Sequence, residues 1–377
     1  MRARKGCRIV MFAAIGLIGL CLLAAGVSAL SNLTFPARPE EMDRLSVLDK
    51  ARFAEAMNLK AKLGESIWPG WESMDMPFVI WNRDYSFLVG LDEPGRGWEI
   101  AADDTFQGKP YYREQSIDPQ NFAVLVNDQW AASMATKNET DQKMREIWQD
   151  VLPPIIEQVF PYRLLLQPSE VQISAVLHES FHVYQMEVAQ DRLEDAEKAY
   201  SYEDRYWLAD EDMDSEWSRE IELLAQALTA EDDAESVQFS REFLEARDDR
   251  RESHQLDSEL IMLEQRYEWL EGLAKYVELE SWRQAWVNDE YEIVEEMEED
   301  PDFKGYGSFE QRWSQEIGQM KRQAGTEGVT RFYYTGMAQA MLLDRLYPGW
   351  KEKIMGDGIW LEDLLREALA QPTTPAG

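Results

Sequence analysis

Residues 171–189 read VQISAVLHESFHVYQMEVA, and their apolar positions have the spacing of a buried α-helix. Within this stretch, residues 178–182 match the pattern H-E-x-x-H. Histidines four residues apart share one face of a helix, so both imidazoles can reach a single zinc ion. The carboxylate between them, Glu179, can then reach a zinc-bound water. The stretch therefore predicts a helix that carries a metal site, with His178 and His182 as ligands.

Histidine is rare in this chain, which contains only three. Two of the three stand at the ligand positions of the pattern, His178 and His182. The alternative interpretation is a helix whose imidazoles only make hydrogen bonds, with Glu179 as an incidental surface acid. The metal site is favoured over this alternative because so rare a residue occupies both required positions.

A catalytic zinc site takes a third protein ligand and leaves the fourth position to water. A third histidine from the longer pattern H-E-x-x-H-x-x-G-x-x-H is ruled out, because Gln185 and Val188 replace the required glycine and histidine. The remaining histidine, His254, lies in the polar run 248–254, where a solvated side chain is expected. The third ligand is therefore predicted to be a carboxylate.

Glu271 is the predicted third ligand. It borders the apolar stripe of a predicted helix, formed by Leu263, Tyr267, Leu270, Ala274 and Val277. A carboxylate that faces a core is costly unless it is paired or bound to a metal, and Gly272 beside it would let this helix approach a neighbour closely. Alternatively, Glu271 flanks a buried helix and extends to water. Glu220 or Glu222, at a shorter spacing from the histidines, is the fallback ligand.

The runs His-Glu-Ser-Phe-His at 178–182 and Glu-Gly-Leu-Ala-Lys-Tyr at 271–276 together resemble the gluzincin-type zinc metallopeptidases. The resemblance is confined to these two short runs. It implies that His178, His182 and Glu271 bind zinc, that Glu179 is the general base, and that this half of the chain is zincin-like. The 88 residues between His182 and Glu271 exceed the usual spacing in the thermolysin-like branch.

Hydrolysis at such a site also needs a donor that stabilises the oxyanion. The candidates are Tyr276, Tyr333, Tyr334 and His254. Tyr334 is the predicted donor, because the pair Tyr333-Tyr334 opens a further predicted helix. Ordinary core packing is the alternative role for these tyrosines.

The flanking sequence predicts an α+β fold. Residues 36–63 have helical apolar spacing, which predicts a helix that ends near Gly64. Short β-rich runs then predict a small, mostly antiparallel sheet, at residues 78–81, 87–89, 98–100, 110–112 and 122–126. From about Thr140 long helical patterns follow, broken by prolines. The predicted organisation is an N-terminal α/β part at 31–139 and a helical, metallopeptidase-like part at 140–377.

Residues 1–30 are predicted to be a signal peptide or a signal anchor. Four basic residues precede Ile9–Leu30, a run of 22 residues without a charge that is long enough to cross a bilayer as a helix. Val27-Ser28-Ala29 is an acceptable cleavage site, so both outcomes remain open. Whether or not cleavage occurs, the body of the protein, residues 31–377, is predicted to be extracytoplasmic. It is secreted if residues 1–30 are cleaved and is held by a single membrane span if they are not. It cannot contain a disulfide, because residues 31–377 lack cysteine.

The charge balance excludes one class of partner. Without the four basic residues near its start, the chain has 34 basic and 72 acidic residues, a net charge of −38. A surface this acidic repels phosphate backbones, so no nucleic acid is expected to bind.

The sequence thus predicts an extracytoplasmic zinc peptidase that acts on peptide or protein substrates, tethered to the membrane if residues 1–30 are not cleaved. The alternative is an extracytoplasmic binding or assembly protein that keeps the metallopeptidase scaffold without hydrolysis.

Overall fold

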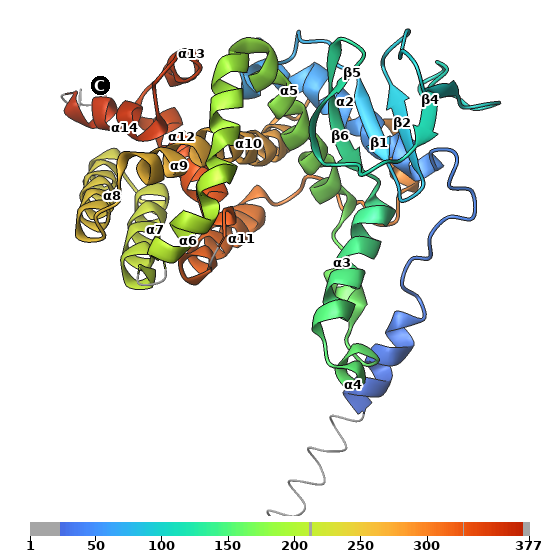
Figure 1. Ribbon diagram of the computed structural model, residues 1–377, viewed down its shortest axis with the longest axis horizontal. Coiled ribbons are helices and arrows are strands. Elements are labelled where there is room, and N and C mark those ends of the chain that lie inside the picture. Colours follow the sequence, from blue (N-terminus) through green and yellow to red (C-terminus); the bar gives the residue numbers. More distant parts are fainter. Residues whose placement is uncertain (1–22, 211–212, 327, 372–377) are drawn as a thin grey trace, which may run out of the picture.

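The computed structural model describes residues 23–210, 213–326 and 328–371. The predicted N-terminal segment, residues 1–30, therefore lies mostly outside the described residues. Within the described ranges no helix is long and apolar enough to cross a membrane. The predicted α+β class is confirmed, with a sheet in the N-terminal half and a helical remainder (Figure 1).

The sheet contains six strands: β1 (Phe78–Trp81), β2 (Tyr85–Val89), β3 (Glu99–Ile100), β4 (Tyr112–Gln115), β5 (Phe122–Val126) and β6 (Gln129–Ala135). Their order is β3-β4-β2-β1-β6-β5. All neighbouring pairs are antiparallel except β1 and β6, which run parallel with Phe78 opposite Ala132. The sheet is therefore mixed, with the mostly antiparallel pairing that the sequence predicts.

Four strands differ from the predicted runs, and two of these differences are small: β2 begins at Tyr85 and not at Phe87, and β3 begins at Glu99 and not at Trp98. β6 was not among the predicted runs, because its sequence QWAASMA is poor in β-branched residues; its pairing with both β1 and β5 makes it a strand. β4 begins at Tyr112 and not at Pro110, since its residues Tyr112–Gln115 pair with β2.

Helix α2 (Val47–Ile67) corrects the predicted helix at 36–63 at both ends. It begins after Ser46, whose hydroxyl oxygen accepts a hydrogen bond from the backbone N–H of Asp49 at 3.1 Å. It continues past Gly64, where a Cβ atom would lie 2.9 Å from the Cα atom of Glu72. Gly64 therefore serves a close backbone approach within the helix and does not end it.

The helices after the sheet are α3 (Lys137–Val151), α4 (Pro154–Glu157), η1 (Tyr162–Leu165), α5 (Ser169–Glu197), η2 (Lys198–Tyr202), α6 (Glu203–Asp210), α7 (Asp214–Thr229), α8 (Asp233–Ser253), α9 (Ser258–Tyr267), η3 (Glu268–Gly272), α10 (Leu273–Val287), η4 (Glu295–Glu299), α11 (Phe309–Arg322), η5 (Gln323–Gly325), α12 (Thr330–Leu346), α13 (Trp350–Ile354) and α14 (Leu361–Ala370). Prolines interrupt this half as predicted, since α3 ends before Pro153 and α5 begins directly after Pro168.

Helix α5 lies at the centre of the molecule and joins the sheet to the other helices. One hydrophobic cluster contains Phe53 of α2, Phe78 of β1 and Phe181 of α5, together with Leu273 of α10. At the start of α5, the Gln172 side-chain amide donates to the carbonyl of the last residue of β6 at 2.7 Å. The helix that carries the H-E-x-x-H residues is thus held between β6 and α10.

Candidate metal centre

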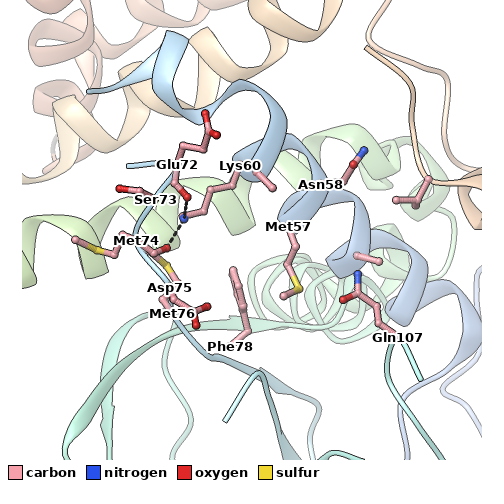
Figure 2. A pocket seen from close by; sticks show the side chains of 13 residues that line it. Met57, Asn58, Lys60, Glu72, Ser73, Met74, Asp75, Met76, Phe78 and Gln107 are labelled. Atoms are coloured by element: carbon pink, nitrogen blue, oxygen red, sulfur yellow. Dashed lines mark hydrogen bonds between the residues drawn. The ribbon is translucent and has the colours of Figure 1, made fainter. Parts of the chain in front are cut away.

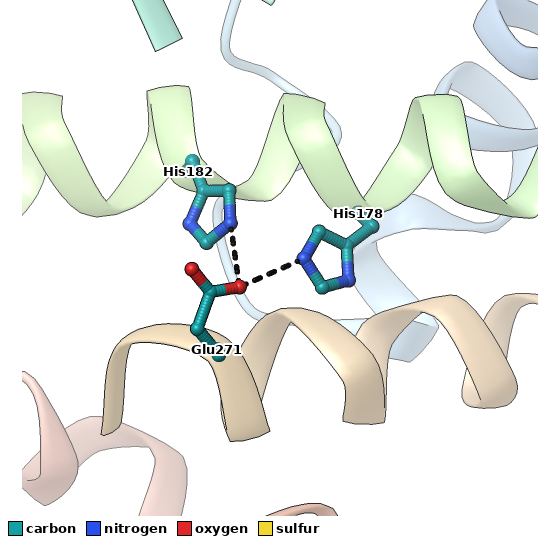
Figure 3. Close-up of side chains that lie close together, drawn as sticks. All are labelled: His178, His182 and Glu271. Carbon is teal, nitrogen blue, oxygen red and sulfur yellow. Dashed lines mark hydrogen bonds and ion pairs between the residues drawn. The ribbon is translucent and has the colours of Figure 1, made fainter. Parts of the chain in front are cut away.

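The three predicted metal ligands meet in the interior. His178 and His182 project from α5 toward Glu271, which lies on η3 of the facing helix (Figure 3). One carboxylate oxygen of Glu271, Oε2, lies 3.2 Å from His178 Nε2 and 3.4 Å from His182 Nε2. All three residues are buried. The structure therefore brings together the ligand set that the sequence predicts.

This arrangement fits a metal ion. One ligand atom from each residue lies within 4.8 Å of the others. Nitrogen and oxygen donors about 2.0–2.1 Å from a tetrahedral ion are separated by about 3.3–3.4 Å. The two measured distances from the Glu271 oxygen, 3.2 and 3.4 Å, are close to that separation. His178, His182 and Glu271 can therefore hold a metal ion.

A second contact fixes the orientation of His182. Its Nδ1 atom lies 2.9 Å from the side-chain oxygen of Gln185, one turn further along α5. An N–H on Nδ1 donates to this oxygen and leaves the Nε2 lone pair directed at Glu271. The amide nitrogen of Gln185 in turn donates to the carbonyl of Trp269 at 2.9 Å. Gln185, which the sequence showed only as a departure from a longer motif, links one ligand to the segment that carries another.

Glu271 lies in a single turn of π-helix, η3, inserted between α9 and α10. A π-turn widens the helix and disturbs its usual carbonyl pairing, and such turns are frequent at functional sites. The start of the turn is fixed by Glu268, which pairs with Arg247 at 2.6 Å and accepts from the Thr335 hydroxyl at 2.6 Å. The position of Glu271 is thus set by buried polar contacts of its neighbours.

The predicted close approach at Gly272 is confirmed, and the neighbour is α12. A Cβ atom at Gly272 would lie 2.5 Å from Gly336 Cα, and one at Gly336 would lie 2.5 Å from the carbonyl oxygen of Glu268. Any side chain at either glycine would force the two helices apart. This contact brings the first turn of α12 over the metal centre.

Tyr333, in that first turn, stacks on His178 with ring centroids 5.9 Å apart and an interplanar angle of 13°. Burial and the Glu271 carboxylate raise the pKa of the Tyr333 phenol well above its usual value, so it stays protonated and can donate. Tyr334, the predicted oxyanion donor, lines the same pocket, with the Lys275 ammonium 5.6 Å from its ring centroid. Both tyrosines therefore reach the site, and Tyr333 contacts a ligand directly.

The other two donor candidates lie elsewhere. Tyr276 is fully buried in the core, where its hydroxyl donates to Asp344 and its ring packs 6.2 Å from that of Trp68. His254 ends α8, where its Nε2 atom lies 3.7 Å from Glu216. Neither residue lines the pocket at the metal centre.

The fallback ligands are also engaged away from the site. Glu220 is fully buried and pairs with Arg247 at 2.8 Å and with Arg250 at 2.9 Å. Glu222 pairs with Lys321 at 2.8 Å. Neither carboxylate belongs to the metal-binding group, which leaves Glu271 as the third ligand.

The metal centre opens into a pocket of about 300 Å³, lined by Asn121, Phe122, Ala175, His178, Glu179, His182, Glu271, Lys275, Glu278, Thr330, Tyr333 and Tyr334. Glu179 lies on its wall, and its carboxylate makes no hydrogen bond or ion pair with any other residue that the structure describes. Burial raises the pKa of Glu179, although His178 and His182 oppose the shift. An acid with a raised pKa and no fixed partner is suited to accept a proton.

Glu278 is a residue of the site to which the sequence analysis gave no role. Its carboxylate lies 3.7 Å from His178 Nδ1 and 2.6 Å from the Lys275 ammonium. It therefore faces Nδ1 of His178 at a distance that is too long for a hydrogen bond but short enough for an ion pair when the imidazole is protonated. Its spacing of seven residues from Glu271 places both on one helix face, and this was the signal available in the sequence.

These carboxylates govern the charge of His178. Burial on its own would lower the pKa of His178, but Glu271 and Glu278 outweigh it and raise the pKa to about 10. With no metal bound, the imidazole is thus protonated and balances the buried acids. A metal ion would take the place of that proton.

A second cavity, of about 520 Å³, lies between α2 and the segment before β1, and methionine side chains line much of it (Figure 2). The Lys60 ammonium donates to the carbonyl of Glu72 at 3.3 Å and also to that of Met74, and burial lowers the pKa of Lys60 to about 8. This cavity shares no residue with the metal centre.

Comparisons with protein-family models, with curated proteins and with solved structures found no match to this chain. The resemblance to gluzincins therefore rests on the two short motifs and on the geometry of the residues that they bring together.

The role of Gln185 can be tested by replacing it with leucine, which is similar in size and cannot accept from His182. We expect the affinity for zinc to fall by about 10–100-fold, as for other partners that orient metal ligands. Competition with a chromophoric chelator measures the affinity. Gln190→Leu, at an exposed position of the same helix, is the control. Equal zinc affinities for the two variants would contradict the role given to Gln185, provided that thermal denaturation shows both to be folded.

Proposed function

We propose that this chain is a zinc-dependent peptidase. The observation that carries the proposal is the convergence of His178, His182 and Glu271 on one point, with Glu179 on the wall of the same pocket. Two imidazoles and a carboxylate suit zinc among the common divalent ions, and three protein ligands leave a position for water.

The chemistry follows from these residues. Zinc, when bound, supplies a Lewis acid that makes a bound water acidic near neutral pH and polarises a carbonyl. Glu179 accepts a proton from the attacking water and returns it to the leaving amine. The protonated Tyr333 and Tyr334 phenols at the pocket wall are available to donate to the oxyanion. Gln185 orients the imidazole of His182 through a hydrogen bond, and the Glu278 carboxylate lies beside the imidazole of His178.

The position of strand β5 favours a peptide over a small amide as substrate. β5 is an edge strand, and its residue Phe122 lies with its ring centroid 4.6 Å from that of His182. An exposed strand edge offers backbone N–H and C=O groups that pair with an extended chain. A peptide paired with β5 would lie beside the pocket of the metal centre, which Asn121 and Phe122 help to line.

The proposed location is extracytoplasmic, either secreted or tethered through residues 1–30. This part of the proposal rests on the basic start of the chain and on the uncharged run Ile9–Leu30.

The test is metal-dependent cleavage of a mixed peptide library by the full chain, purified in mild detergent without added metal. We expect about one zinc per chain by elemental analysis, as for a single site with three protein ligands. Cleavage should stop after chelation and return on addition of zinc but not of magnesium. The proposal fails if the protein takes up no zinc when it is offered, or if the cleavage is insensitive to the chelator.

A further inference from the structure

Two segments that are distant in sequence form an arm that projects from the body of the protein (Figure 1). The arm consists of residues 23–36 and residues 137–166, which include α3, α4 and η1. Asn32 joins the two segments, because its side-chain amide donates to the carbonyl of Phe160 at 2.7 Å and its side-chain oxygen accepts from the N–H of Tyr162 at 3.1 Å. Residues 23–32 are helical, and these two bonds tie the end of their helix to the segment between α4 and η1.

The arm exposes an unusual amount of apolar surface. Nineteen large hydrophobic residues are exposed in the described chain, and eleven of them lie in the arm: Leu23, Val27, Leu30, Leu33, Met144, Ile147, Trp148, Val151, Ile155, Ile156 and Leu164. Ile155 is 82% exposed and Leu164 is 80% exposed. Single exposed apolar residues are normal on soluble proteins, whereas a gathering of them marks a surface that binds a partner or a membrane.

The arm also lacks the acidity of the rest of the protein. Residues 23–36 carry no charged side chain, and residues 137–166 carry four basic and five acidic ones, a net charge of −1. Residues 31–377 as a whole have a net charge of −38. The arm is thus the nearly neutral, apolar end of a strongly acidic molecule, and it can approach a membrane surface without the electrostatic cost that the body would incur.

Aromatic side chains add a further property of membrane interfaces. Trp148 of α3 is 37% exposed, and its ring stacks on that of Phe160 with centroids 5.1 Å apart. Tryptophan is enriched where headgroups meet the hydrocarbon core.

We propose that the apolar end of the arm lies in the interface of a lipid bilayer. The uncharged run Ile9–Leu30 ends within the arm, whose first helix contains residues 23–30 of that run, and Asn32 ties the end of this helix to Phe160. An apolar surface that continues a run long enough to cross a bilayer has lipid as its expected neighbour. The uncharged run and the arm would then attach the protein to the membrane at two places. Two attachments hold the body of the protein in one orientation above the membrane. This inference does not depend on the proposed peptidase activity.

The experiment places one environment-sensitive fluorophore on the full chain in vesicles of zwitterionic phosphatidylcholine. The label is attached to Ile156→Cys in a background of Cys7→Ser and Cys21→Ser, which removes the two native cysteines. Ile117→Cys is the control outside the arm, since Ile117 lies between β4 and β5. Ile117 is 89% exposed and Ile156 is 46% exposed, so the arm position that matches Ile117 in exposure is Leu164, at 80%. Quenching by lipids with a doxyl group on the acyl chain reports contact with lipid, and quenching by aqueous iodide reports contact with water.

The label at Ile156 is expected to be quenched several-fold more by the doxyl lipid than the label at Ile117, and several-fold less by iodide. A second label, at Leu164→Cys, is expected to behave like the label at Ile156. Iodide quenching at Ile156 equal to that at Ile117 would overturn the proposal. Protection of Ile156 from both quenchers would also overturn it, because protein and not lipid would then cover the arm.

Discussion

Replacing Glu271 by alanine is expected to remove the bound zinc and, with it, all metal-dependent turnover. The substitution leaves two imidazoles with no anionic ligand. Loss of a residue that only orients a ligand costs about 10–100-fold in metal affinity, so the loss of a ligand is expected to cost more than about 100-fold. Elemental analysis after dialysis and chelator competition measure the effect on the full chain.

Glu222→Ala is the control for this substitution. Glu222 has a shorter sequence spacing from the histidines than Glu271, but its carboxylate pairs with Lys321 outside the pocket. It is expected to keep about the parental zinc content, since it supplies none of the three ligands. If Glu271→Ala retains its zinc and Glu222→Ala loses it, the assignment of the third ligand is wrong. Denaturation of each variant in the presence of chelator shows whether a loss of metal follows from a loss of fold.

The three residues that could hold a metal ion were predictable because each depends on a local pattern. The spacing of His178 and His182 already determines that they share a helix face, and the stripe beside Glu271 determines that it faces inward. The glycine at 272 indicated a close helix contact, which the structure shows against Gly336. Local periodicity thus identified His178, His182 and Glu271 as inward-facing side chains. Only the tertiary fold shows that they lie next to one another.

The orienting residues were less predictable, because their roles depend on contacts between distant segments. Gln185 reaches the carbonyl of Trp269, 84 positions further along the chain, and nothing in the local sequence marks that contact. The choice between Tyr333 and Tyr334 depends on the rotation of α12 about its axis, which the contact at Gly336 fixes. Strand β6 was missed for the same reason, since its neighbours β1 and β5 supply the pairing that its composition does not favour.

The π-turn at η3 likewise could not be anticipated from local sequence. Its first residue, Glu268, is held by Arg247, which also pairs with Glu220 and with Glu362 of the last helix. Replacing such a buried ionic cluster as a whole with apolar residues is often neutral for stability, whereas removing one partner leaves an uncompensated charge. The main effect of the cluster is therefore to hold η3, the segment that carries Glu271, in one position. Its contribution to the free energy of unfolding is expected to be smaller.

Replacing Glu179 by glutamine is expected to reduce the turnover number by about 10²–10⁴-fold, the usual contribution of a general base. Glutamine has nearly the same shape, but it cannot accept the proton of the attacking water. Glu179 is not among the three ligands, so zinc content should remain at the parental level. Rates of peptide cleavage under saturating substrate, together with elemental analysis, separate the two quantities. Glu187→Gln, at an exposed position of the same helix, should match the parent in both.

This variant also separates the peptidase from the alternative of a binding or assembly protein on the same scaffold. A scaffold protein can hold zinc through His178, His182 and Glu271 for stability alone, and then Glu179 has no proton to accept. In that case the parent and Glu179→Gln would bind the same zinc and show the same absence of cleavage. If the parent cleaves peptides and Glu179→Gln cleaves them equally fast, the assigned base is wrong although the protein is an enzyme. The proposed mechanism predicts that Glu179→Gln keeps its zinc and loses its turnover. In this mechanism Glu179 accepts a proton from the attacking water and does not bind the metal.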